Sequence, residues 1–167
     1  KGRTLGSLQR QMREWHRDAE AMQRIERMRQ MAEAARGGRQ SGEQQGGRWT
    51  GARIESWTWQ PSSKEARCRG EAFEVVQLTS GADLLEESRA MHHCVWTYAA
   101  KCVTGHASIW SLRRKTPGTR PQRLLTIELD RQNRAVQVRG FANRLALPYE
   151  LGILVRWTMA RGVMLYL

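Results

Sequence analysis

The period of the hydrophobic pattern changes at Gly105, and this change limits the fold of the chain more than any other feature. After it, three segments alternate apolar and polar residues, at 108–114, 123–130 and 134–140. A period of two predicts β-strands. Because the two connections between the segments are only a few residues long, we expect an antiparallel meander rather than parallel strands, which need a longer crossover.

Strand and helix signals on both sides of the meander complete a pattern typical of an α+β domain. Residues 53–60 and 71–80 predict one or two further strands. Ser80 predicts the N-cap of a helix, and a second helix is expected over 92–102. Pro148 stands where the first turn of a last helix is expected. The expected fold is therefore an antiparallel sheet with helices on one face.

Alternation along the strands assigns side chains to the two faces of this sheet. The apolar face, which we expect to pack against the helices, carries Trp110, Leu112, Leu125, Ile127, Leu129, Val136 and Val138. The opposite, polar face carries Ser111, Arg113, Thr126, Glu128, Gln137 and Arg139. Directly after the last strand, Gly140 frees the backbone to turn and Asn143 offers a versatile hydrogen-bonding group, so a recognition loop is expected there.

The first part of the chain differs in composition from the rest. Residues 1–36 are expected to form a helical arm, because apolar residues recur at helical spacing over 5–36. Residues 37–48 are rich in glycine and polar residues and predict a flexible linker, after which 49–167 form the α+β domain. The arm is expected either to pack on its own domain, to bind a protein partner or to contact nucleic acid.

The chain is strongly basic, with 28 Lys and Arg residues against 16 Asp and Glu and a net charge of +12. Arginine accounts for 24 of the basic residues, and its forked donors suit phosphates and bases. Residues 113–144 alone hold nine basic residues and only two acidic ones. We therefore expect a nucleic-acid partner, DNA or RNA.

The residues expected to bind nucleic acid lie on the polar face and in the segments beside it. Phosphate contacts are expected from Arg113, Arg114, Arg123, Arg139 and Arg144. Contacts to bases or sugars are expected from Gln137 and Asn143. Stacking on unpaired bases is expected from Trp57, Trp59 or Phe141.

The sequence holds no sign of a membrane segment or of a disulfide framework. No apolar run approaches the roughly 18–20 residues of a transmembrane helix. The three cysteines, Cys68, Cys94 and Cys102, form an odd and sparse set that favours a reducing compartment. We therefore expect a cytoplasmic protein without membrane contact.

The segment "MHHCVWTY", residues 91–98, concentrates reactive side chains and allows three interpretations. The first is a zinc site, which would need four convergent ligands. In a continuous helix over 92–102, however, Cys94 and Cys102 lie about 12 Å apart along the axis, too far to share a metal or to form a disulfide. We therefore expect no metal and no other cofactor.

The other two interpretations of this segment stay open. Cys94 lies near the expected N-terminus of a helix and next to His93, an arrangement typical of catalytic thiols. Glu128 would join them in such a catalytic site. Alternatively, Cys94 and Tyr98 belong to the core and His93 is hydrogen-bonded beneath the sheet.

An ordered series of motifs runs through about residues 71–160. A leucine-rich acidic helix leads to His-Cys-Val-x-x-Tyr, then to a glycine, a Ser-Ile-x-Ser-Leu-Arg strand, a Thr-x-Glu strand and a Gln-x-x-Gly-x-x-Asn turn. Its positions are His93, Cys94, Val95, Tyr98, Gly105, Ser108, Ile109, Ser111, Leu112, Arg113, Thr126, Glu128, Gln137, Gly140 and Asn143. The series resembles the PcfJ-like proteins of conjugative plasmids, phages and related mobile elements. The chain departs from the family pattern at Trp96, where a small residue is expected.

The resemblance implies an accessory role in a mobile element, and its polar positions come from four segments that look like one shared site. Together with the charge, it favours a nucleic-acid-binding accessory module that works within a larger complex. The alternative is an enzyme that acts on nucleic acid through His93, Cys94 and Glu128. A structural subunit tethered by the 5–36 helix is the third hypothesis.

Overall fold

We describe the protein from a computed structural model, which describes residues 47–167. The predicted helical arm, 1–36, lies outside the described residues, as does the predicted linker, 37–48, apart from its last two positions. The predictions for the arm and its partners therefore remain predictions.

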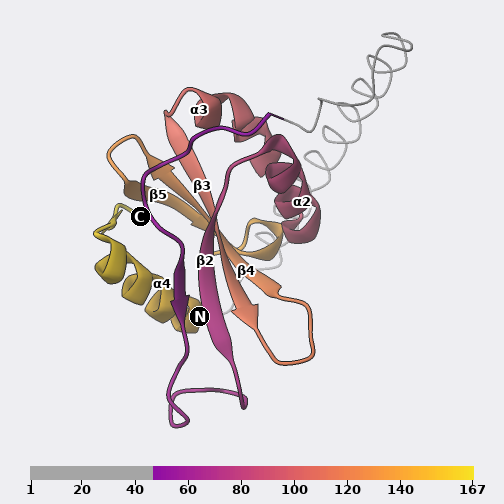
Figure 1. Ribbon diagram of the computed structural model, residues 1–167, viewed down its shortest axis with the longest axis vertical. Helices are drawn as coiled ribbons and strands as arrows, with labels where there is room; N and C mark the ends of the chain where they lie inside the picture. The colour runs from indigo at the N-terminus through magenta and orange to yellow at the C-terminus, as the bar shows by residue number, and fades with distance from the viewer. Residues whose placement is uncertain (1–46) are drawn as a thin grey trace, which may run out of the picture.

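Six strands form one sheet, and they lie side by side in chain order (Figure 1). They are β1 (Trp57–Trp59), β2 (Ala72–Leu78), β3 (Ala107–Lys115), β4 (Gln122–Asp130), β5 (Arg134–Arg139) and β6 (Met164–Leu165). The predicted meander is confirmed, since each strand from β1 to β5 pairs antiparallel with the next. The sheet is nevertheless mixed rather than antiparallel, because β6 returns after a helix and pairs parallel with β5.

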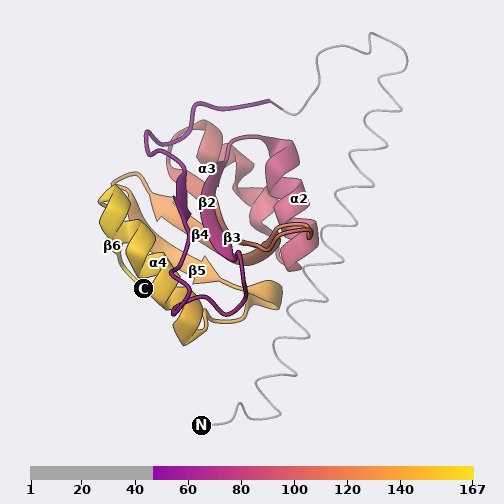
Figure 2. The ribbon, with the colours of Figure 1, turned by 60° about the horizontal axis from the view of Figure 1, so that its bottom comes forward.

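The helices cover both faces of the sheet, so the prediction of helices on one face is wrong (Figure 2). They are α2 (Gly81–Met91), the short 3-10 turn η1 (Val95–Tyr98), α3 (Ala99–Val103), the 3-10 turn η2 (Phe141–Asn143) and α4 (Pro148–Arg161). Helix α4 packs on the apolar face, while α2, η1 and α3 pack on the other. The second packing is stabilised by Leu78 and Ile109, two apolar residues on the otherwise polar face.

The predicted apolar face forms the main core, with one exception. Trp110, Leu112, Leu125, Ile127, Leu129 and Val138 pack against Ile153, Leu154 and Trp157 of α4. Val136 is exposed, and the neighbouring Ala135 is buried in its place. The register between β4 and β5 shifts between Glu128 and Leu129, and such a bulge changes which residues face inward.

The predicted continuous helix over 92–102 is wrong, because residues 92–94 are not helical and the rest is divided into η1 and α3. His92 adopts a left-handed conformation, with φ 52° and ψ 53°, and ends α2. Ser88 holds the break: its carbonyl accepts from the backbone N–H of His93, at 3.3 Å, and its hydroxyl accepts from that of Trp96, at 2.9 Å. The break turns η1 across the polar face instead of extending α2.

Candidate functional site

A cavity of about 170 Å³ opens between η1, the polar side of β4 and β5, and η2. Its walls consist of His93, Cys94, Val95, Thr97, Tyr98, Ile109, Thr126, Glu128, Gln137, Arg139 and Asn143. Four segments of the chain, 93–98, 109, 126–128 and 137–143, therefore meet there. Of the predicted site residues, the cavity brings together all three of the candidate catalytic set and three of the nucleic-acid set, Gln137, Arg139 and Asn143.

Four side chains of β4 and β5 form the floor of the cavity. In the antiparallel register Thr126 stands opposite Arg139, and Glu128 stands opposite Gln137. Directly opposed side chains are about 5 Å apart at their Cβ atoms and lie on the same face of the sheet. The strand alternation predicted these four residues on one face, and the structure confirms it.

A buried chain of hydrogen bonds fixes the ring of His93 at one side of the cavity. His93 Nε2 lies 2.8 Å from Thr126 Oγ1, and that hydroxyl donates to Glu87 Oε1 at 2.7 Å. Because the hydroxyl proton points to Glu87, its oxygen accepts from His93, and the Nε2 atom carries the proton. The lone pair of His93 therefore resides on Nδ1, which is buried without a hydrogen-bond partner in the described part of the chain.

Burial keeps the His93 ring neutral. The loss of hydration lowers the pKa of His93 to about 4, and the neighbouring His92 lowers it further. The prediction that His93 is hydrogen-bonded beneath the sheet is confirmed. The sequence pattern assigns no site role to its partner Glu87 and places Thr126 on the polar face of the sheet, without a catalytic role. The burial of Glu87 could have been predicted only from its spacing, since Leu84, Glu87, Ser88 and Met91 lie on one face of the helix.

Stability is expected to fall as the pH drops below neutrality, because of His93. Its folded pKa of about 4 lies below the unfolded value near 6.5, so the unfolded chain binds the proton more readily. The stabilisation is complete above pH 6.5 and is lost between pH 6.5 and 4, with a slope of up to about 1.4 kcal/mol per pH unit. Urea unfolding between pH 7 and pH 5 measures it. A His93→Gln variant should flatten the slope, whereas His106→Gln, at an exposed ring, should not; equal slopes in all three proteins contradict the assignment.

Glu128 and Tyr98 form the polar end of the cavity. The Tyr98 hydroxyl donates to Gln137 Oε1 at 3.4 Å and also contacts the Glu128 carboxylate. Burial raises the pKa of Glu128, although Lys101 and the Tyr98 hydroxyl favour its charged form. Burial and the nearby Glu128 raise the pKa of Tyr98. The carboxylate is thus partly desolvated and has acceptor capacity left for a ligand with N–H groups.

The turn after β5 places Asn143 at the cavity and exposes the ring of Phe141. Ala142 and Asn143 both have left-handed backbones, with φ 51° and 60°, and such strain is concentrated at functional loops. Gly140 leaves room for Arg144, because a Cβ atom would lie 2.5 Å from the Arg144 guanidinium. Phe141 is about half exposed and packs on the His92 ring, with 4.6 Å between ring centroids. The predicted recognition loop therefore presents the Asn143 amide to the cavity and a half-exposed ring that packs on His92.

The thiols differ in their surroundings. Cys94 is half-buried and lines the cavity, so it belongs to the site rather than to the closed core. Cys102 is buried, and burial raises its pKa to about 11, which makes it inert. Within the described residues the three cysteines form no disulfide.

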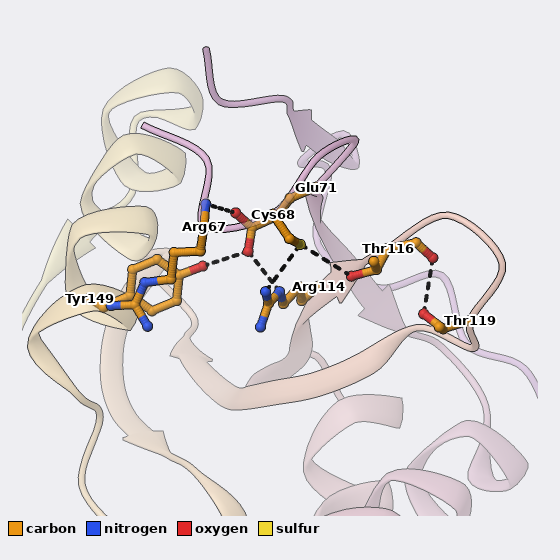
Figure 3. A network of polar contacts seen from close by, with 7 residues as sticks. All are labelled: Arg67, Cys68, Glu71, Arg114, Thr116, Thr119 and Tyr149. Atoms are coloured by element: carbon orange, nitrogen blue, oxygen red, sulfur yellow. Dashed lines mark hydrogen bonds and ion pairs between the residues drawn. The ribbon is translucent and has the colours of Figure 1, made fainter. Parts of the chain in front are cut away.

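Arg114, Arg123 and Arg144 contact carboxylates inside the domain. Figure 3 shows Arg114 directed at Glu71: its Nε lies 2.7 Å from Oε1 without hydrogen-bond alignment, and its Nη2 donates to Cys68 Sγ at 3.3 Å. Arg123 Nε donates to the fully buried Glu87 at 2.7 Å. Arg144 binds Glu150 with two hydrogen bonds of 2.7 and 2.6 Å. These three guanidiniums are engaged within the fold.

Among the predicted phosphate ligands, Arg113 and Arg139 form no ion pair with a carboxylate of the described residues. Arg113 Nε donates to Ser111 at 3.1 Å, on the polar face. Arg139 donates to the carbonyl of Val138 and lines the cavity. The positive charge available to a ligand is therefore smaller than the composition of 113–144 implies, and of these two arginines Arg139 lines the cavity.

The tryptophans predicted to stack on bases belong to the core. Trp57 is buried, and Trp59 is stacked on Phe73 and covered by Arg156. Stacking by Trp57 is therefore excluded by its burial, while Phe141 retains an exposed ring face. In the part of the chain that the structure describes, no three His, Cys, Asp or Glu side chains converge on a metal site. No helix there has the length and apolar character to cross a bilayer.

The family model described as PcfJ-like protein matches residues 7–151. The chain belongs to the PcfJ-like family. The match begins at residue 7, whereas the motif series begins at about residue 71. The family model therefore also covers most of the predicted arm and the predicted linker, which contain none of the motifs. No curated protein and no solved structure matches the chain.

The motif series that carries the PcfJ-like resemblance converges on the cavity. Nine of its positions are among the eleven residues of the cavity wall, and only Thr97 and Arg139 are additions. Thr97 is missed by sequence reasoning because it is not a position of the motif series. Trp96, the departure from the family pattern, packs against the second core cluster rather than into the cavity.

Proposed function

We propose that this PcfJ-like protein binds single-stranded nucleic acid and holds one unpaired nucleotide in the cavity between η1 and β4–β5. The observation that carries the proposal is the convergence of the family motif on one polar cavity that Arg139 lines. At about 170 Å³ the cavity is smaller than the roughly 300–1,000 Å³ of sites that enclose a drug-sized ligand. It suits one base or sugar of a longer chain that continues over the surface.

The surroundings of the cavity support a nucleic-acid ligand. Arg139 and Arg113 are the predicted phosphate ligands that no carboxylate of the described residues neutralises. Phe141 offers an exposed ring on which a base can stack, and Gln137 and Asn143 offer amide donors and acceptors. Phosphate, aromatic and amide contacts together are typical of proteins that bind unpaired nucleotides. The accessory role in a mobile element is proposed from the family resemblance.

Titration of a fluorescein-labelled single-stranded oligonucleotide by fluorescence anisotropy tests the proposal. Because at least one phosphate is expected to meet Arg113, log Kobs is expected to fall with log salt with a slope of about −0.7 or steeper. A duplex of the same sequence should bind more weakly, since its bases are not available to the cavity. Absence of binding at low salt, or an affinity independent of salt, contradicts the proposal.

An enzymatic function is the second candidate, and the state of His93 favours it. The Nδ1 lone pair is held ready by the Thr126–Glu87 hydrogen bonds, and the neighbouring Cys94 lines the same cavity. Nucleophilic catalysis generally uses a thiol or hydroxyl next to a general base, such as a histidine, whose ring is oriented by a third residue. Incubation of labelled oligonucleotides with the parent and with Cys94→Ala, followed by gel analysis, separates the two candidates: a product formed by the parent alone supports the enzyme.

A further inference from the structure

The floor of the cavity offers a carboxylate and a guanidinium in a fixed relation. Glu128 and Arg139 lie on the same face of adjacent strands, two residue pairs apart, with the Ile127–Val138 pair between them on the other face. Two residues along a strand span about 7 Å. Neither side chain forms an ion pair with a charged group of the described residues within 4 Å. An acceptor and a donor fork are therefore available side by side for one planar ligand.

A carboxylate accepts two hydrogen bonds at once when a ligand presents two neighbouring N–H groups. Guanine does so, through N1–H and the N2 amino group on its Watson–Crick edge. Adenine and cytosine place an amino group beside a ring acceptor, and uracil or thymine places one N–H between two carbonyls. Each of these bases would turn at least one lone pair toward Glu128.

The guanidinium completes the match with the adjoining edge of guanine. Arginine binds the O6 and N7 acceptors of guanine with a bidentate pair of hydrogen bonds. On guanine these acceptors adjoin the N1–H and N2 donors, as Arg139 adjoins Glu128 in the register of β4 and β5. The amide of Gln137, opposite Glu128, adds a donor and an acceptor on the same row.

We propose that the cavity selects guanine, with Glu128 accepting from N1–H and N2 and with Arg139 donating to O6 and N7. This inference rests on the proposed nucleic-acid binding and names the base that the site takes. Burial raises the pKa of Glu128, and two guanine donors favour its charged form, which strengthens the preference for a ligand with N–H groups.

Four oligonucleotides test the selection: a single-stranded oligothymidylate with one central guanine, and the same chain with inosine, adenine or cytosine at that position. The parent protein is expected to bind the guanine chain at least tenfold more tightly than the adenine and cytosine chains. Inosine lacks only the N2 amino group, so its chain should bind several-fold more weakly than the guanine chain. The same series in RNA shows whether the sugar matters.

A matched pair of variants assigns the effect to the carboxylate. Glu128→Gln should abolish the preference for guanine over inosine and leave the salt slope of binding unchanged. Glu86→Gln removes the same charge from a side chain that is 70% exposed on α2, and it should leave the preference intact. Equal affinities of the parent for all four chains overturn guanine selection but leave nucleic-acid binding standing. Failure of the parent to bind any of the four chains overturns both proposals. The comparison of guanine with inosine uses the parent protein, so its result does not depend on whether a variant folds.

Discussion

The Glu87→Ala variant is expected to lose about 3–5 kcal/mol of its free energy of unfolding. Glu87 is fully buried and accepts from Arg123 at 2.7 Å and from Thr126 at 2.7 Å. Its removal leaves the guanidinium without its buried counterion and the Thr126 hydroxyl without an acceptor, and it releases the His93 ring. Breaking a buried pair by removing one partner is far more destabilising than losing an ion pair on the surface.

Glu86→Ala is the matched control for this prediction. Glu86 is the neighbouring residue of α2, contacts the same guanidinium at 3.2 Å and is mostly exposed. Its loss should change stability by less than about 1 kcal/mol. Chemical denaturation of the parent and both variants gives the comparison. If the two alanine variants unfold at the same denaturant concentration, Glu87 does not anchor α2 to the sheet.

The Arg144→Ala variant is expected to be destabilised by about 3 kcal/mol, at the lower end for a buried pair because Arg144 is about a quarter exposed. Glu150 is buried and loses both hydrogen bonds from the guanidinium, keeping the backbone N–H of Leu147 at 2.9 Å. The variant also removes the side chain for which Gly140 leaves room. The turn that presents Asn143 should therefore loosen together with the start of α4.

The comparison with Arg139→Ala separates two kinds of arginine that look alike in the sequence. Arg139 forms no ion pair with a carboxylate of the described residues, so its replacement should change the free energy of unfolding by less than about 0.5 kcal/mol. Thermal melts of the two variants are sufficient for this test. An Arg139→Ala protein as unstable as Arg144→Ala would show that Arg139 supports the fold rather than a ligand.

The strands were predictable because their signals are local. Alternation after Gly105, short connections and the Ser80 cap place β3, β4, β5 and the start of α2 where the structure has them. The same alternation places Thr126, Glu128, Gln137 and Arg139 on one face. The motif series predicted that its polar positions share a site. His93, Cys94, Tyr98, Glu128, Gln137 and Asn143 line the cavity, whereas Arg113 does not.

The remaining features depend on contacts between distant residues, which the sequence pattern does not express. The break at His92 is held by Ser88, and nothing in the local sequence requires it. The packing of helices on both faces follows from Leu78 and Ile109, two apolar residues on a polar face. The charge of 113–144 also misleads, because Arg114, Arg123 and Arg144 are paired with carboxylates of β2, α2 and α4 or the segments beside them. Charge counted along the chain therefore overstates the charge that a ligand meets.

The affinity of Arg139→Ala for a single-stranded oligonucleotide tests the central claim, that the cavity is the nucleic-acid site, most directly. With the fold intact, binding by this variant is expected to be at least tenfold weaker than binding by the parent. The slope of log Kobs against log salt should stay close to that of the parent, because Arg139 contacts the base rather than a phosphate. An Arg139→Ala protein that binds the oligonucleotide with the affinity of the parent would contradict the claim and place any nucleic-acid contact elsewhere on the protein.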